Sequence, residues 1–149
     1  MNGLNLLKNI KITRVLAAQA DGQDTWSSDI LDMSGFDGIM FIAKFDDVDN
    51  TSVLTLQAQQ NTIDSTVGMA TLSGSSTYTA AATDADNDLL VLDIYRPRER
   101  YLRAQVVAAT ANATVSGVIA IQYNKIGETP ITQPATVLDS DTLISPAEA

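Results

Sequence analysis

The sequence contains no cysteine and no histidine among its 149 residues. Without cysteine, the chain has neither disulfide bonds nor thiolate chemistry. Without histidine, it lacks the commonest metal ligand and the usual general base near neutral pH, so a Ser–His or Cys–His nucleophile is excluded. Aromatic residues make up only 5%, which leaves little material for an aromatic platform that binds sugars.

Long apolar runs and positive charge are also scarce. No apolar run approaches the roughly 20 residues that span a bilayer, and the opening MNGLNLLKNIKI lacks the features of a signal peptide. We therefore expect synthesis in the cytosol and no membrane partner. Nine Lys and Arg stand against eighteen Asp and Glu, a net charge of -9. Because affinity for nucleic acid depends on neutralised phosphates, we expect no nucleic-acid partner.

What the chain does contain is β-branched residues in alternating patterns. Its length fits one domain, and alternation is far commoner than helical periodicity. The patterns predict an all-β fold of short strands, which fits a sandwich, a jelly roll or a barrel. The clearest predicted strands are 9–16, 38–45, 52–60, 88–95, 101–107 and 115–123, with shorter ones around 28–33, 68–72 and 77–81.

Two of these segments are mostly apolar. Residues 38–45, GIMFIAKF, are apolar on both faces except at Lys44, which predicts a central strand. Residues 88–95, DLLVLDIY, also have the composition of a buried strand.

The C-terminal residues differ from the rest. We divide the chain into a β-sandwich domain, residues 1–126, and a Pro/Thr-rich arm, residues 127–149, which suits an extended conformation. A disordered tail is the alternative. A docked arm is favoured by isolated apolar residues that a solvating tail does not need, and we expect it to be ordered only against a neighbouring subunit or partner. These residues are Ile131, Val137, Leu138, Leu143 and Ile144.

No catalytic or metal-binding motif survives inspection. The acidic turn DADND, residues 84–88, has the alternating aspartates of a calcium loop, but Leu89 and Tyr95 occupy the positions that require glycine and glutamate. The adjacent carboxylates Asp46 and Asp47 cannot face each other across a cleft as acid and base. The sequence has no phosphate-binding glycine loop. We therefore expect no enzymatic activity, no metal and no cofactor.

One basic cluster interrupts this acidic chain. Four of its five arginines fall within eight residues of the stretch DIYRPRERYLRAQ, namely Arg96, Arg98, Arg100 and Arg103. Pro97 cannot donate to a strand ladder and biases Arg96 towards extended geometry, which predicts a corner between two strands. A salt-bridged corner and a protein-contact site are both open, because arginine is enriched at interfaces.

Within this cluster we expect the four arginines to contribute to different properties. All four arginines should serve protein contact rather than nucleic acid, and Arg98 and Arg100 should matter most for that contact. Arg96 and Arg103 should matter more for stability, through pairing with carboxylates such as Asp93. Trp26, the single tryptophan, lies between acidic and serine residues and is a candidate anchor for the core or for a subunit contact.

The order of these features resembles the small capsid decoration, or cement, proteins of tailed bacteriophages. The resemblance covers roughly residues 4 to 126. It rests on NLLKNIKITRVL, SGFDGIMFIAKF, LLVLDIYRPRERYLRAQVV and VSGVIAIQYNK, and the DIYRPRERYLR segment is its most specific part.

The resemblance implies a jelly-roll-like antiparallel β-sandwich on the outer surface of the virion, made in the host cytoplasm. Its partners would be the major capsid protein, whose subunits it bridges and stabilises, and further copies of itself in a homodimer or homotrimer. A neck, tail or fibre-associated phage protein is one alternative, and a carbohydrate-binding sandwich is another.

Overall fold

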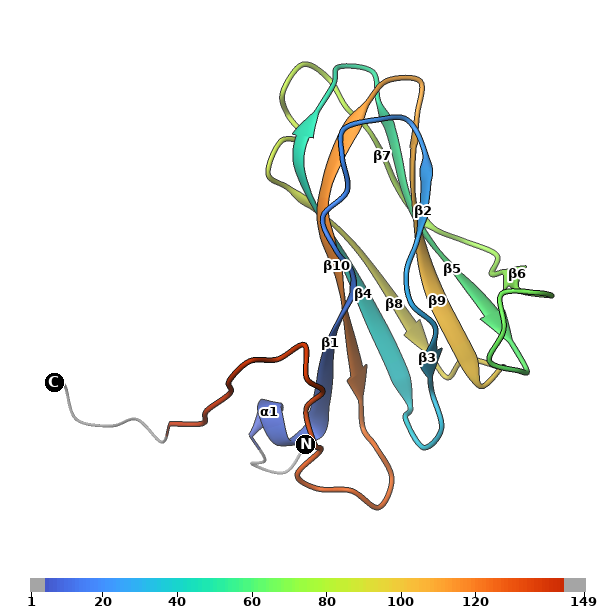
Figure 1. The fold of residues 1–149 in the computed structure, drawn as a ribbon, viewed down its shortest axis with the longest axis vertical. Coiled ribbons are helices and arrows are strands. Elements are labelled where there is room, and N and C mark those ends of the chain that lie inside the picture. Colours follow the sequence, from blue (N-terminus) through green and yellow to red (C-terminus); the bar gives the residue numbers. More distant parts are fainter. Residues whose placement is uncertain (1–4, 144–149) are drawn as a thin grey trace, which may run out of the picture.

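Two antiparallel sheets lie face to face in the computed structural model, which describes residues 5–143 (Figure 1). The first sheet has the order β1-β10-β4-β8, and its strands are β1 (Ile10–Leu16), β4 (Gly38–Val48), β8 (Leu89–Tyr95) and β10 (Ala113–Tyr123). The second sheet consists of β2 (Thr25–Ser27), β3 (Leu31–Asp32), β5 (Val53–Asn61), β6 (Ala70–Thr71), β7 (Ser76–Thr79) and β9 (Tyr101–Ala109). A short helix, α1 (Leu6–Asn9), precedes β1.

The strands pair in the nested order of a jelly roll. β1 pairs with β10, and β2 and β3 pair with β9. β4 pairs with β8, and β5 pairs with β6 and β7. Strands near the two ends of the domain are therefore partners, as in a long hairpin rolled up on itself. The predicted all-β, jelly-roll-like sandwich is confirmed.

The core lies between the sheets and is built by alternation along the long strands. Every second residue points inward, and the largest fully buried side chains come from β4, β5, β9 and β10. They include Phe41, Phe45, Leu54, Leu56, Leu102, Val106, Val115 and Val118. Burial of each large side chain contributes about 1.5–3 kcal/mol, so this interface supplies most of the driving force for folding.

Of the predicted strand around residues 28–33, only β3 (Leu31–Asp32) is a strand in the structure, and the separate strand β2 (Thr25–Ser27) precedes it. The backbone N–H of Ser28 donates to the carbonyl of Ala104 over 2.9 Å, and Ala104 N–H donates to the Ser28 hydroxyl over 2.9 Å. The side chain thus takes the place of a backbone carbonyl in the ladder, which interrupts the strand at this point.

The structure changes the interpretation of β8. Its composition suggested a buried strand, but it forms an edge of the first sheet, and its alternate residues are exposed. Leu89 and Val91 are 54% and 45% exposed, while Leu92 and Ile94 pack against the core. A strand that is apolar on both faces does not reveal from its sequence whether one face is covered.

The C-terminal arm follows the outer edge of β1 for part of its length. The Ile131 N–H donates to the Lys8 carbonyl over 3.0 Å, and Ile131 itself is buried. Gln133 accepts from Ile12 N–H over 2.9 Å and donates to the Ile10 carbonyl over 2.7 Å. Thr136 accepts from Arg14 N–H over 3.3 Å.

These contacts correct the expectation that the whole arm is ordered only against a neighbour. Residues 131–136 contact their own domain, where polar side chains satisfy the backbone groups of an edge strand. Beyond them, Leu138 and Leu143 are 98% and 69% exposed. The last apolar residue of the arm, Ile144, lies outside the described residues.

Glycine is required at position 38, where the ring of Tyr123 covers the backbone. A Cβ at this position would overlap the Tyr123 ring. The Tyr123 hydroxyl donates to Asp93 over 2.8 Å. Burial, together with this hydrogen bond to a carboxylate, raises the pKa of Tyr123 to about 12.

The substitution Gly38→Ala should therefore displace the Tyr123 ring. We expect a loss of about 1–3 kcal/mol in the free energy of unfolding, measured in urea, because overpacking forces the ring and its neighbours to shift. The pKa of Tyr123, followed by ultraviolet absorbance, should fall back towards the ordinary value. Gly22→Ala is the matched control, since a Cβ there has nothing within 4 Å. Equal effects of both substitutions would contradict the close contact.

The substitution Gln133→Ala should release the arm from β1. It removes hydrogen bonds to the backbone of Ile10 and Ile12, and we expect a loss of about 1–2 kcal/mol in unfolding free energy. Hydrogen exchange at Ile12 N–H should accelerate, and proteases should cut the arm sooner. Thr132→Ala, an exposed neighbour, should leave both measurements unchanged. Unaltered exchange at Ile12 in the Gln133 variant would show that the arm does not protect this edge.

Candidate interaction surfaces

The arginine cluster forms the corner between β8 and β9. Arg96 has a φ of +52° and its N–H donates to the Asp37 carbonyl over 2.8 Å. The expected extended geometry at Arg96 is therefore wrong. The chain reverses at this residue, and the hydrogen bond to Asp37 anchors the reversal to the segment that enters β4.

Arg100 is the cluster member that forms a salt bridge. Its guanidinium donates two hydrogen bonds to the Asp32 carboxylate, over 2.9 Å and 2.8 Å. This hydrogen bonding holds the pKa of Asp32 below its ordinary value, although partial burial acts in the opposite direction. The fork geometry fixes β3 against the start of β9. Arg100 thus has an ion-pair partner in its own domain, and its contact with another protein stays a prediction.

The expected partners of Arg96 and Arg103 are not the observed ones. Arg103 donates to the Gln59 amide oxygen over 2.8 Å, across the β5–β9 pair. Asp93 instead accepts from Tyr123. The Arg96 guanidinium lies 5.1 Å from the centre of the Tyr95 ring. Within residues 5–143, no salt bridge involves Arg96 or Arg98, and both side chains are exposed. They remain available to a partner.

Trp26 faces the core from β2. It lies opposite the buried Val106 of β9, and its half-buried side chain packs against the core cluster. The structure thus places it at the rim of the core, and a subunit contact through this residue stays a prediction.

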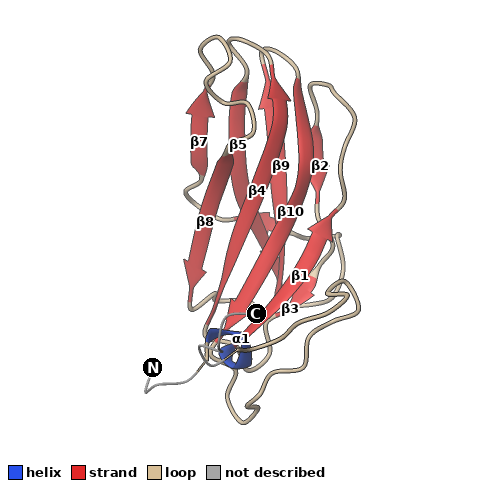
Figure 2. Ribbon diagram, turned by 90° about the vertical axis from the view of Figure 1, so that its left-hand side faces the viewer, coloured by secondary structure: helices blue, strands red, loops and turns tan. Residues whose placement is uncertain are grey.

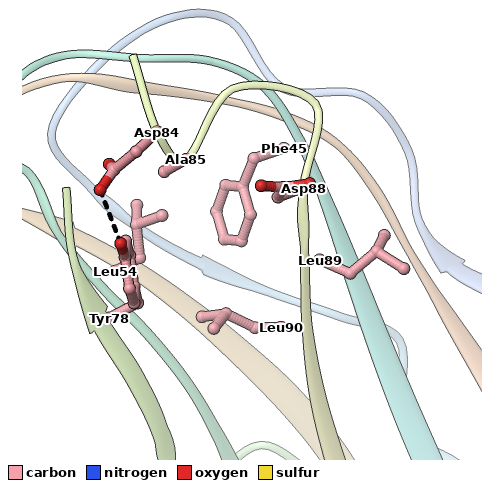
Figure 3. Close-up of a pocket in the computed structure, with 8 residues that line it drawn as sticks. All are labelled: Phe45, Leu54, Tyr78, Asp84, Ala85, Asp88, Leu89 and Leu90. Atoms are coloured by element: carbon pink, nitrogen blue, oxygen red, sulfur yellow. Dashed lines mark hydrogen bonds between the residues drawn. The ribbon is translucent and has the colours of Figure 1, made fainter. Parts of the chain in front are cut away.

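In the acidic turn between β7 and β8, one carboxylate closes the turn and another accepts a hydrogen bond from the end of β4. Asp84 accepts from the Tyr78 hydroxyl over 2.7 Å (Figure 3). It also accepts from Ala81 N–H over 2.8 Å. Asp86 accepts from Val48 N–H over 2.9 Å. Hydrogen bonding, mainly from Tyr78, lowers the pKa of Asp84. In residues 5–143, no group of three acidic side chains is placed to hold a metal ion.

The largest feature that the sequence did not reveal is an apolar outer face on the first sheet. The register places the side chains of neighbouring strands in rows across this face, such as Arg14–Ile119–Ile42–Val91. We define the outer face by Ile12, Arg14, Met40, Ile42, Lys44, Leu89, Val91, Asp93, Ile119 and Ile121. Figure 2 shows its four strands side by side.

This outer face is open to solvent and hollowed at one end. Ile119, Val91 and Leu89 are between 43% and 54% exposed. A hollow of about 450 Å³ lies between Arg14 and Lys44, beside a bulge at Gly117. The Gly117 φ is +150°, and a Cβ there would lie only 2.9 Å from the Leu16 carbonyl oxygen. Glycine therefore permits the close approach of β10 to β1 at the bulge.

No protein-family model and no curated protein matches the chain. Several solved structures are similar to it. One is from infectious bursal disease virus, Gt strain, with a TM-score of 0.45 and 14% identity over 81% of this chain and 34% of that chain. The Eiger TNF of S. frugiperda has a TM-score of 0.37, with 9% identity over 80% of this chain and 99% of that chain.

A third similar structure is the enzymatically active domain of tailspike protein 4 from bacteriophage CBA120. Its TM-score is 0.38, with 16% identity over 78% of this chain and 19% of that chain. The present chain thus spans about a third of the bursal virus chain and a fifth of the tailspike chain. No helix among residues 5–143 is long and apolar enough to cross a membrane.

The Asp32–Arg100 pair should make stability depend on pH. A carboxyl with a lowered folded-state pKa contributes stability above its unfolded pKa, about 3.9, and loses that contribution as the pH falls through the folded value. Asp32→Asn should therefore be less stable than the wild type at pH 7, and the difference should shrink below about pH 4. Urea unfolding at several pH values measures it.

Arg98→Ala is the matched control, because Arg98 lies in the same corner without a salt bridge in the described residues. Its stability should follow the wild type across the pH range. A pH-independent difference between Asp32→Asn and the wild type would show that the pair does not act through ionisation.

Proposed function

We propose that this chain is a non-enzymatic structural protein of a phage virion. It binds the outer surface of an assembled capsid and stabilises the capsid by bridging subunits of the major capsid protein. The single observation that carries this proposal is the apolar outer face of the first sheet. The resemblance of residues 4–126 to capsid decoration proteins supplies the identity of the partner.

The outer face has the character of a protein-binding surface. Exposed apolar patches that span several strands are uncommon on monomeric proteins and mark sites of interaction. The exposed side chains belong to Leu89, Val91 and Ile119, on two strands that lie on either side of β4. Such a face lowers the solubility of the protein unless a partner covers it.

The charges around this face fit an acidic or neutral partner surface. Arg14 and Lys44 border its hollow end, although the chain as a whole carries a net charge of -9. Rim charges of this kind fix orientation and raise association rates more than they raise affinity. The remaining acidic surface would keep decorated particles apart by like-charge repulsion.

A neck, tail or fibre-associated phage protein is the main alternative, and it would use the same face on a different partner. The number of copies per particle distinguishes the two. Hundreds of copies would support the capsid surface, whereas six or twelve would support a neck or tail position.

The substitution Ile119→Asp should weaken capsid binding. It places a charge at the centre of the apolar face, and we expect at least about a tenfold loss of affinity, or about 1.4 kcal/mol. Binding is measured as copies bound per undecorated particle over a range of protein concentrations. The fold should be retained, because Ile119 is 43% exposed.

Ile63→Asp provides the matched control. Ile63 is 58% exposed but lies in the segment between β5 and β6, away from the first sheet. It should bind particles as the wild type does. If both substitutions leave binding unchanged, the outer face is not the capsid-binding surface. If both abolish it equally, the loss is one of folding.

A further inference from the structure

The two edges of the first sheet differ in whether another segment covers their backbone groups. The arm covers the edge at β1, where Gln133 and Thr136 bond to the strand backbone. At the opposite edge, β8 pairs with β4 on one side, and no strand of residues 5–143 pairs with its other side. Figure 2 shows β8 at this open border. Its outer backbone groups are therefore free to pair with another chain.

β8 has few of the features that normally prevent an edge strand from pairing with another chain. The register with β4 runs without a shift from Leu89 to Tyr95, so no bulge twists the edge away. The strand contains no proline and no lysine, and its one charge, Asp93, accepts a hydrogen bond from Tyr123. A regular apolar edge of this kind normally has a partner strand, because it otherwise invites uncontrolled association.

The space beside β8 is also open. A hollow of about 380 Å³ lies at the start of the strand, lined by residues such as Tyr78, Asp88 and Leu90 (Figure 3). A second hollow of about 640 Å³ lies at its end, lined by residues that include Ile94 and Arg98. The second sheet therefore leaves room on the free side of β8.

The two ends of β8 carry opposite charges. Asp84, Asp86 and Asp88 precede the strand, and Arg96 and Arg98 follow it. In the described part of the chain, neither arginine nor Asp88 takes part in a salt bridge. A strand with an acidic start and a basic end is complementary to itself when two copies run antiparallel.

We propose that β8 pairs with β8 of a second copy, antiparallel and centred on Leu92, to form a two-fold dimer. In this register all seven residues of β8 are paired, and Asp88 of each copy lies opposite Arg96 of the other. Leu89 lies opposite Tyr95 of the second copy on the outer face, where both side chains are more than half exposed. The two first sheets then form one continuous sheet of eight strands.

Neighbouring registers are less favourable. A shift in one direction places Asp93 opposite its own copy, and like charges directly opposite each other destabilise a strand pair. A shift in the other direction places Asp88 opposite Ile94 and Leu89 opposite Asp93. A shift that pairs odd with even positions sets outward residues of one copy against inward residues of the other.

The arm of the same chain is a poorer occupant of this edge. It leaves the domain beside β1, and β10 and β4 lie between β1 and β8. Its exposed part contains Asp139 and Asp141 and no basic residue, so it offers nothing to the acidic turn. A second copy offers both charges in the required order. The dimer requires no capsid, so its test is independent of the proposed function.

The first test measures self-association by sedimentation velocity over a range of concentrations. The wild type should form dimers, and Arg96→Asp should weaken the dimer at least about tenfold, because two attractive contacts become repulsive. Aspartate tolerates the positive φ at this position. The double variant Asp88→Arg with Arg96→Asp should restore dimerisation. Lys8→Asp, in α1 beside the covered edge, should have no effect on dimerisation.

The second test reads the register with cysteine pairs, which the cysteine-free chain makes unambiguous. A mixture of Leu89→Cys chains and Tyr95→Cys chains should form a disulfide-linked heterodimer under mild oxidation, while either variant alone should not crosslink. The two Leu89 positions would lie about 20 Å apart in this register. A wild type that stays monomeric, a charge swap that fails to restore the dimer, or self-crosslinking of one variant would overturn the proposal.

Discussion

The packing of the two sheets against each other is the interaction on which the rest of the structure depends. The inward side chains of β4 and β10 meet those of β5 and β9, and most of the largest of them are almost completely buried. Because side chains alternate along a strand, fixing the inner face also fixes which residues point outward. Phe41 and Phe45 face the core, so Met40, Ile42 and Lys44 must face away from it. The apolar outer face is thus a consequence of the register that the core imposes.

The sequence was sufficient to predict the long strands and the fold class. Alternation in residues 52–60 has a single physical interpretation, because one face is apolar and the other polar. It was insufficient for β8, where both faces are apolar and only the tertiary arrangement decides that one of them is open. The same ambiguity hid the outer face, since an apolar residue such as Ile42 is compatible with a fully covered central strand.

The partners of the charged side chains could not be predicted from the sequence either. Asp32 and Arg100 are 68 positions apart, and they meet because β3 pairs with β9. Asp93, which lies close to the arginines in the sequence, points to the outer face and accepts from Tyr123 instead. Because Asp93 is close to the arginines in the sequence, the sequence predicted that they would pair. The jelly roll instead brings distant segments together at the corner. Only the location of the corner itself, marked by Pro97, could be predicted.

The net charge of -9 bears on how such a chain could associate with itself. Over distances longer than about 8–10 Å, salt screens the repulsion between copies, so specific contacts decide the outcome at close range. Around β8 the charged residues are separated by sign, with aspartates before the strand and arginines after it. Parallel pairing would bring like charges together at both ends, and antiparallel pairing brings unlike charges together. The arginines, which are unusual in such an acidic chain, thus lie where they would favour antiparallel pairing of β8. In other orientations, nothing would offset the repulsion between two chains that both carry net negative charge.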